Sequence, residues 1–281
     1  MTNRPNVVTI GDFIADDNVA IVTKVTGWGS APKRVSINAR AQQIGGWDAT
    51  GFDGPRQIEV EGVVLADTPQ DAAARADALA ALTPRTIQRF SVDNETVGLR
   101  WCMVRVTVGA DPEWMDDSSF AYSLTLVAPD PLKYGAENFG QAPFAAAAGG
   151  TGLVYPLAYP LDYGVAPGVT PGSVACANAG TASYWPTLRI DGPVRNPVVS
   201  LVETGDWIRY GGTIPDGQHL DIDCANRRVT IGDTPVSVRS KVTSYGSWLA
   251  VPPGGGSVAV TADTAGANSA LSVWSREGAW S

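Results

Sequence analysis

An alternating strand that ends in two closely spaced prolines constrains this chain more than any other stretch. Over Phe120–Leu126, apolar side chains alternate with small or polar ones, so the apolar set lies on one face of a half-buried strand. Pro129 and Pro131 follow, and neither has the N–H group that a sheet ladder requires. Each proline also biases the residue before it toward extended geometry. The chain therefore leaves a sheet here and continues as an extended segment.

The composition indicates a folded, mostly β protein. The 281 residues are 44% hydrophobic and 17% charged, and 31 glycines and 20 prolines supply many turns. The formal net charge of −8 argues against binding nucleic acid through its phosphates, which requires basic patches. Such a charge is compatible with a wall that DNA slides past without binding.

Neither a leader peptide nor a membrane anchor is expected. No apolar run approaches the ~20 residues of a membrane helix, and Met1–Asn6 leads directly into the apolar Val7–Ile10. We therefore expect synthesis and assembly in the cytoplasm. Cys102, Cys176 and Cys224 are odd in number and widely spaced, which favours buried free thiols over disulfides or a zinc site.

One helix is predicted, at about residues 69–82. Thr68 suits the N-cap and Pro69 the first helical position, and apolar residues then recur at helical spacing up to Leu82, before Pro84 ends the helix. A single amphipathic helix among strands has to pack its apolar stripe on a sheet. The first part of the chain is therefore predicted to be β-rich with one covering helix.

Three further strands are predicted around this helix. Arg56–Val64 alternates cleanly, with apolar residues on the inner face. Thr86–Val92 and Val97–Val108 follow the helix, and Asp93 and Asn94 between them tolerate the positive φ of a tight hairpin turn.

Regular periodicity vanishes from residue 136 to 183, where Gly, Ala and Pro are frequent. Tyr155, Tyr159 and Tyr163 make this segment more apolar than a solvated tether tolerates. A plain linker is one interpretation, but we favour an extended arm that contacts a surface such as a neighbouring subunit. Trp114, in an acidic loop, is a further candidate for a subunit contact.

Residues 184–281 are predicted to form a β-sandwich, because short strands and turn signals alternate there. His219 is the only histidine, and no Gly-x-Ser-x-Gly motif accompanies it. Asp221 and Asp223 share one strand face and could hold calcium or act as acid and base. A solvated face, or for Asp223 a turn toward Asn226, is favoured instead. We therefore expect no enzyme, cofactor or metal site.

Two groups of motifs resemble the distal tail proteins of long-tailed phages. The Ala-Pro-Asp-Pro sequence at Ala128–Pro131 resembles the end of the N-terminal domain in that family. An ordered series of short motifs resembles the family's galectin-like C-terminal domain. In this sequence the series is carried by Asn178, Gly180, Pro186, Leu188, Ile190, Gly192, Asn196, Pro197, Thr204, Gly205, Gly217, Leu220, Ile222, Asp223, Arg228, Val229, Trp248, Pro253, Gly254, Trp274, Arg276 and Trp280.

This resemblance implies both a fold and a function. The chain would be mainly β, with an N-terminal β-barrel covered by one α-helix (1–135), an extended arm or linker (136–183) and a C-terminal galectin-like β-sandwich (184–281). Six copies would form a ring that joins the tail tube to the tail tip or baseplate hub. The protein would then be a structural component of the virion, located at the tail tip.

The implied partners are further copies of the chain, the tail tube protein, the tail tip or hub protein and the tape-measure protein, with DNA passing through unbound. The alternative interpretation is a tail-tip adhesin whose sandwich binds host cell-wall carbohydrate. Trp207, Trp248 and Trp274 are the candidates for stacking on sugar rings, although filling the sandwich core is the favoured use of these side chains.

Overall fold

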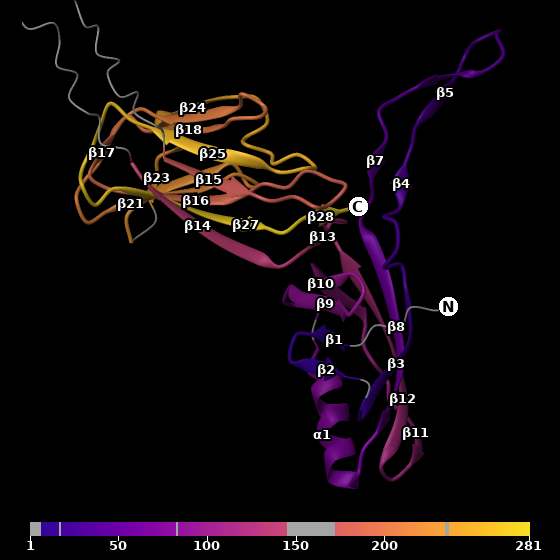
Figure 1. The fold of residues 1–281 in the computed structure, drawn as a ribbon. Coiled ribbons are helices and arrows are strands. Elements are labelled where there is room, and N and C mark those ends of the chain that lie inside the picture. The colour runs from indigo at the N-terminus through magenta and orange to yellow at the C-terminus, as the bar shows by residue number, and fades with distance from the viewer. Residues whose placement is uncertain (1–6, 17, 83, 145–171, 234–235) are drawn as a thin grey trace, which may run out of the picture. The chain divides into compact units, whose positions relative to one another are not determined.

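The computed structural model divides into two compact units (Figure 1). The first comprises Met1–Ala136 together with Trp280–Ser281, and the second comprises Glu137–Ala279. The structure describes residues 7–16, 18–82, 84–144, 172–233 and 236–281.

An antiparallel sheet forms most of the first unit. Its main path runs in the order β2, β1, β9, β10, β12, β8, β3, while β11 pairs with β12 and β13 with β10. The bounds are β1 (Val7–Ile10), β2 (Phe13–Ala15), β3 (Ala20–Thr26), β8 (Arg56–Leu65), β9 (Gln88–Asn94), β10 (Gly98–Val108), β11 (Glu113–Asp116), β12 (Ser119–Ala128), β13 (Lys133–Tyr134) and, at the end of the chain, β28 (Ala279–Trp280).

The alternating strand that precedes Pro129 and Pro131 lies inside this sheet. β12 pairs with β8 along its whole length, from Ser119 opposite Leu65 to Ala128 opposite Arg56. Phe120, Tyr122, Leu124 and Leu126 are buried in the core of the unit, as the alternation predicts. The strand ends at Ala128, directly before Pro129.

Helix α1 (Pro69–Ala80) covers the core, within the range predicted from the sequence. The side chain of Thr68 accepts a hydrogen bond from the Asp71 amide at 3.2 Å, which caps the first turn. Ala72 and Leu79 are fully buried, and the helix packs against β2, β8 and β12.

The sheet is not closed into a barrel in the described residues, in contrast to the barrel expected from the resemblance. Its path begins at β2 and ends at β3, and these two strands do not pair. β2 has three residues against seven in β3, which is too short for an extended ladder.

The β9–β10 hairpin forms where it was predicted, but its positive φ lies elsewhere. The Asn94 side chain accepts a hydrogen bond from the Thr96 amide at 2.8 Å, and Gly98 has φ +70°. The prediction that Asp93 and Asn94 supply the positive φ is therefore wrong, because glycine adopts this conformation without the steric cost of a Cβ atom.

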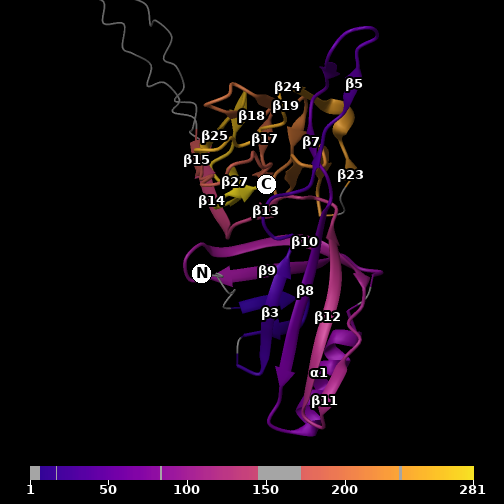
Figure 2. The same ribbon diagram turned by 90° about the vertical axis from the view of Figure 1, so that its right-hand side faces the viewer.

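The connection between β3 and β8 is a two-stranded ribbon that extends away from the sheet (Figures 1 and 2). β4 (Lys33–Arg34) pairs with β7 (Phe52–Asp53), and further out β5 (Ile37–Ala39) pairs with β6 (Gly46–Asp48). We call residues 31–55 the β-ribbon.

The second unit is a β-sandwich of a six-stranded and a five-stranded sheet. The six-stranded sheet has the order β14 (Glu137–Pro143), β27 (Ala270–Arg276), β16 (Thr187–Asp191), β21 (His219–Asp223), β22 (Arg228–Ile231), β23 (Val236–Ser237). The five-stranded sheet has the order β15 (Gly172–Cys176), β25 (Gly256–Thr261), β18 (Val198–Leu201), β19 (Trp207–Tyr210), β24 (Val242–Tyr245). Three short strands, β17 (Val194–Arg195), β20 (Thr213–Ile214) and β26 (Thr264–Ala265), and the 3-10 turn η1 (Arg239–Lys241) complete the unit.

The sandwich begins earlier in the chain than residue 184. β14 and β15 lie within residues 136–183, the range expected to be an arm, yet they are edge strands that pair with β27 and β25. The remaining part of that range, residues 145–171 with Tyr155, Tyr159 and Tyr163, lies outside the described residues. The proposed contact role of these three tyrosines therefore stays a prediction.

The contacts of Asn178 explain why the first C-terminal motif combines an asparagine at 178 with a glycine at 180. Its buried side chain donates to the carbonyl oxygens of Ala182 (2.9 Å) and Val251 (3.0 Å) and accepts from the amides of Gly180 (3.1 Å) and Ala279 (3.2 Å). A Cβ atom at Gly180 would overlap the Ala279 backbone. The motif thus joins distant segments of the sandwich through one saturated amide. The three cysteines are free and buried, as predicted.

Candidate assembly surfaces

The β-ribbon exposes large apolar side chains along its length. The exposed fractions are 61% for Val35, 68% for Ile37, 101% for Ile44, 64% for Trp47 and 62% for Phe52. Soluble monomers rarely present so many large apolar groups on one projecting element, and such a surface usually marks a protein contact. The ribbon is therefore a candidate contact surface of the first unit.

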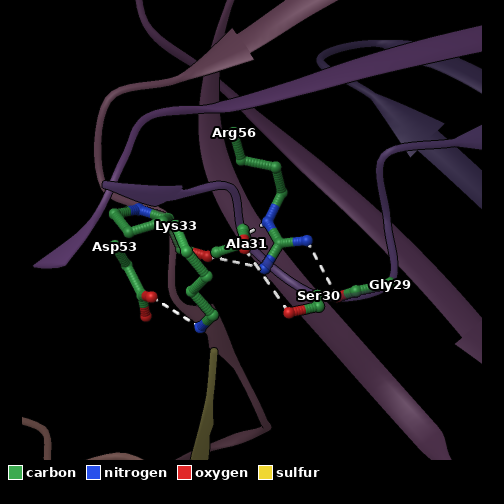
Figure 3. Close-up of polar contacts among 7 residues, drawn as sticks. Gly29, Ser30, Ala31, Lys33, Asp53 and Arg56 are labelled. Carbon is green, nitrogen blue, oxygen red and sulfur yellow. Dashed lines mark hydrogen bonds and ion pairs between the residues drawn. The ribbon is translucent and has the colours of Figure 1, made fainter. Parts of the chain in front are cut away.

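A buried arginine fixes the backbone where the ribbon leaves the sheet. Arg56, the first residue of β8, is fully buried. Its guanidinium donates to the carbonyl oxygens of Pro131 (3.0 and 2.9 Å), Gly27 (2.8 Å) and Gly29 (2.9 Å). Figure 3 shows Arg56 beside Gly29. One side chain thus connects the segment after β3 with the proline-rich segment after β12.

Lys133 also holds the backbone at the base of the β-ribbon, which we call the ribbon root. Its ammonium group donates to the carbonyl oxygens of Trp28 (2.9 Å) and Gly29 (2.8 Å) and lies 5.5 Å from the centre of the Trp28 ring. Burial, and then the charge of Arg56, lowers the pKa of Lys133 to about 8. Burial likewise lowers the pKa of Arg56. Two cations in one buried site raise each other's energy, so the carbonyl dipoles have to supply the compensating stabilisation.

The path of the chain at the root leaves little freedom. Gly27 has φ +74°, and a Cβ atom there would overlap the carbonyl oxygen of Gln57. Beyond the turn, Lys33 and Asp53 form an ion pair of 2.5 Å across β4 and β7, which is also visible in Figure 3. The ribbon therefore projects from a fixed base.

Two strand edges flank the part of the sheet that β8 and β12 form. In the described residues β3 pairs only with β8 on one side, and β11 pairs only with β12 on the other. Strand edges with free backbone groups are templates for pairing with another chain. Trp114 lies on strand β11 and not in a loop as predicted, because Glu113–Asp116 pairs with β12; it is 49% exposed and packs against Phe120 with ring centres 5.0 Å apart. Its predicted role in a subunit contact stays a prediction, and its position on an edge strand is suited to that role.

The face of this sheet opposite the core is polar around Glu59 and Glu61 of β8. Glu59 lies across from Thr125 on β12 and Thr26 on β3, and Glu61 lies in the same way beside Ser123 and Lys24. Lys24 and Glu61 form an ion pair of 3.0 Å. The part of this face around Glu59 and Glu61 is therefore hydrophilic, while Val63, with Ala121 and Ile21 opposite it, continues the same face with apolar side chains.

The three tryptophans that were candidates for contact with carbohydrate lie in three different environments. Trp248 is only 3% exposed, with the guanidinium of Arg239 4.7 Å from its ring centre, so its ring cannot stack on a ligand from solvent. Trp207 lies on β19 of the five-stranded sheet and stacks on Tyr245. Trp274 lies on β27 of the six-stranded sheet and is 41% exposed.

The candidate acid–base and metal residues are engaged otherwise. Asp223 accepts hydrogen bonds from the amide (3.0 Å) and side chain (2.7 Å) of Asn226, which confirms the predicted turn. Asp221 accepts two from Arg189, and His219 lies 3.4 Å from the same carboxylate. Across the described residues, no group of three or more His, Cys, Asp or Glu side chains is placed to hold a metal ion. No described helix is long and apolar enough to cross a membrane.

Comparison with known proteins gives matches of two kinds. Residues 179–273 match the family model described as "Siphovirus-type tail component, C-terminal domain". The fold is similar to that of SPP1 Dit (gp 19.1), described as a paradigm of the hub adsorption apparatus in Gram-positive-infecting phages, with 16% identity, a TM-score of 0.62, and 96% of this chain and 98% of that chain covered. No curated protein matches the chain.

Two structures of the phage P2 baseplate in its activated conformation are also similar. The one with Ca has 11% identity and a TM-score of 0.53, with 97% of this chain and 99% of that chain covered. The one with Sr has 12% identity and a TM-score of 0.52, with 95% and 97% covered. At these identities the structures share the fold. Together with the family match, they confirm the resemblance to siphophage distal tail proteins that the motifs indicated.

Proposed function

We propose that this protein is a structural component of a siphophage tail in which several copies, six according to the family resemblance, form a ring. The ring joins the tail tube to the tail tip or baseplate hub. The observation that carries this proposal is the pair of strand edges, β3 and β11, on opposite sides of one sheet. The family match and the shared fold with SPP1 Dit support the same role.

The two edges favour a ring over a two-fold dimer. Different surfaces on opposite sides of a subunit make head-to-tail contacts, and such contacts close into a ring when the rotation per copy divides a full turn. Pairing of β3 in one copy with β11 in the next would continue the sheet from copy to copy around the ring and cover both of these edges. The β-ribbon adds a second contact, since its apolar side chains would be buried against the neighbouring copy.

The polar face of the same sheet is the proposed wall of the channel. In a ring closed through β3 and β11, the core and α1 lie on one side of the sheet, and the face with Glu59 and Glu61 lies on the other. On this wall the ammonium group of Lys24 is paired with Glu61, and the carboxylate of Glu59 repels phosphates, so DNA would pass without binding. The tube protein, the hub protein and the tape-measure protein are the proposed partners at the two ends of this channel.

The proposed role is geometric and requires no catalysis. The protein would be found in the virion at the tail tip, after assembly in the host cytoplasm. Its two units would then divide the work, with the first unit forming the ring and the sandwich remaining available for other contacts.

Cross-linking between the two edges tests the proposal. A cysteine is placed on each edge by Thr23→Cys and Met115→Cys, which is practical because the three native cysteines are buried. After treatment with a bismaleimide, the double variant is expected to give a ladder of oligomers that ends at a closed ring, whereas each single variant gives no product beyond a dimer. A double variant that stops at a dimer would show that β3 and β11 do not meet between copies.

A further inference from the structure

The outward face of the six-stranded sheet of the sandwich carries two rows of polar and aromatic side chains. Residues directly opposite in an antiparallel sheet share a face. The pairing registers give one row as Phe139, Trp274, Thr187, Asp223 and Arg228. They give the adjacent row as Gln141, Ser272, Arg189, Asp221 and Thr230.

Trp274 is not needed to fill the core of the sandwich. Its strand neighbours Leu271 and Val273 point inward and are fully buried, while the indole of Trp274 is 41% exposed. The ring lies between two depressions of the surface. One, of about 360 Å³, is lined by Trp274 with Thr187, Arg189, Asp221 and Arg228 among others, and one of about 240 Å³ is lined by Trp274 with Trp185, Glu137 and Arg276 among others.

The larger depression holds a fixed ion pair beside the indole. Arg189 donates from Nε and Nη2 to the two carboxylate oxygens of Asp221, at 2.7 and 3.0 Å. The guanidinium lies 5.8 Å from the centre of the Trp274 ring, and both partners of the pair remain about a third exposed, at 39% and 33%. The bidentate geometry fixes donors and acceptors in place before any ligand arrives.

The charges that line this depression balance. Arg189 lies opposite Asp221, and Arg228 lies opposite Asp223. A site with two cations and two anions favours neither a phosphate polymer nor a metal ion. It suits a neutral ligand that has many hydrogen-bonding groups.

We propose that this face binds a neutral saccharide, with one pyranose ring stacked on Trp274 and its hydroxyl groups hydrogen-bonded to the Arg189–Asp221 pair. A pyranose presents an apolar C–H face to an aromatic ring and has hydroxyl groups at its rim. The sheet face offers the complementary groups side by side, namely the indole of Trp274 and the Arg189–Asp221 ion pair. A volume of about 360 Å³ lies at the small end of ligand sites, which span roughly 300–1,000 Å³. The site is on the second unit and does not depend on ring formation by the first.

Trp207, on the other sheet of the sandwich, is a matched comparison. Its ring is stacked on Tyr245 with an angle of 19° between the planes, so one aromatic face is already covered. Phe139 contacts Trp274 at 54°, which is a tilted contact and not a parallel stack. Trp274 is therefore the tryptophan suited to stacking on a sugar, and Trp207 provides the control.

The test uses the full chain on a printed array of neutral oligosaccharides, acidic oligosaccharides and glycerol-phosphate polymers. Binding to a neutral pyranose-containing glycan is expected, and titration calorimetry with that glycan should show an affinity loss of about tenfold or more in Trp274→Ala. Asp221→Asn should weaken binding as well, since it removes the charge that orients Arg189. Trp207→Ala should leave the affinity unchanged, and thermal unfolding of each variant verifies that it is folded.

Three results would overturn the inference. The first is that no neutral glycan binds at millimolar concentration. The second is binding to the anionic polymers alone. The third is that Trp274→Ala leaves glycan affinity unchanged, or changes only the mass of the assembled particle, which would make this face a contact between copies.

Discussion

Replacement of Arg56 by methionine tests the account of the ribbon root. Methionine keeps much of the apolar stem but removes the guanidinium, so four hydrogen bonds to three carbonyl oxygens are lost. The carbonyl of Gly29 retains Lys133, whereas those of Gly27 and Pro131 lose their contacts with the guanidinium.

The expected magnitude follows from these two carbonyl groups. Each buried polar group that loses its partner costs about 1–3 kcal/mol, and relief from burying a charge offsets part of the sum. We expect Arg56→Met to lower the free energy of unfolding by about 2–4 kcal/mol. With roughly 3 °C per kcal/mol for a unit of this size, the melting temperature of the first unit should fall by about 6–12 °C.

Arg105→Met is the matched control. Arg105 also donates to two backbone carbonyl oxygens, those of Pro84 (2.9 Å) and Arg85 (3.1 Å), but it is exposed to solvent. Water can replace its hydrogen bonds, so a change within about 0.5 kcal/mol is expected. Urea unfolding gives both free energies, and hydrogen exchange should show faster exchange over Gly27–Ala31 in Arg56→Met alone. Equal stability of the two variants would refute the reasoning.

Three further predictions follow from other parts of the structure. Burial lowers the pKa of Lys133 from 10.5 to about 8, so between these pH values the folded protein binds fewer protons than the unfolded chain. In urea unfolding, the free energy of unfolding of the wild type should therefore rise with pH relative to that of Lys133→Met, by up to about 1.4 kcal/mol per pH unit. A difference between the two proteins that stays constant from pH 8 to pH 10 would contradict this. Asn178→Ala removes four hydrogen bonds of a buried amide and should lower stability by about 2–4 kcal/mol in thermal unfolding, against less than about 1 kcal/mol for the exposed Asn226→Ala. Trp47→Ser on the β-ribbon should leave the stability of the monomer within about 0.5 kcal/mol but raise the concentration needed for assembly about tenfold in sedimentation experiments. Val202→Ser on the sandwich is the control, since Val202 is 60% exposed against 64% for Trp47, and it should leave assembly unchanged.

Local patterns predicted the elements whose signals are local. The N-cap at Thr68 and the proline at 69 located α1, and strict alternation located β8 and β12. Parity placed Asp221 and Asp223 on one face, because a strand alternates whichever sheet it joins.

The β-ribbon escaped prediction because its stability and its surface depend on non-local contacts. Ile37 and Trp47 have the residue types of a core, and no local signal shows that they remain exposed. The sequence predicted Arg56 as the start of an alternating strand. Its burial depends on the carbonyl groups of Gly27, after β3, and Pro131, after β12, which are both far from Arg56 in the sequence.

In the sandwich, the pairing of β14 could not be predicted from local sequence, whereas the exposure of Trp274 could. β14 lacks alternation because Gly140 sits against Val174, where a Cβ atom would overlap the valine side chain, so the segment read as an arm. The exposure of Trp274, in contrast, could have been predicted. Leu271 and Val273 alternate toward the core, and the parity of the same strand places Trp274 on the solvent side.

The mass and shape of the purified protein in solution test the central claim most directly. Mass photometry combined with electron microscopy should show a ring with a central channel and a mass of about 176 kDa, which is six times the chain mass of 29.4 kDa. A protein that remains a 29.4 kDa monomer at tens of micromolar, both alone and with the tail tube protein, would contradict the account.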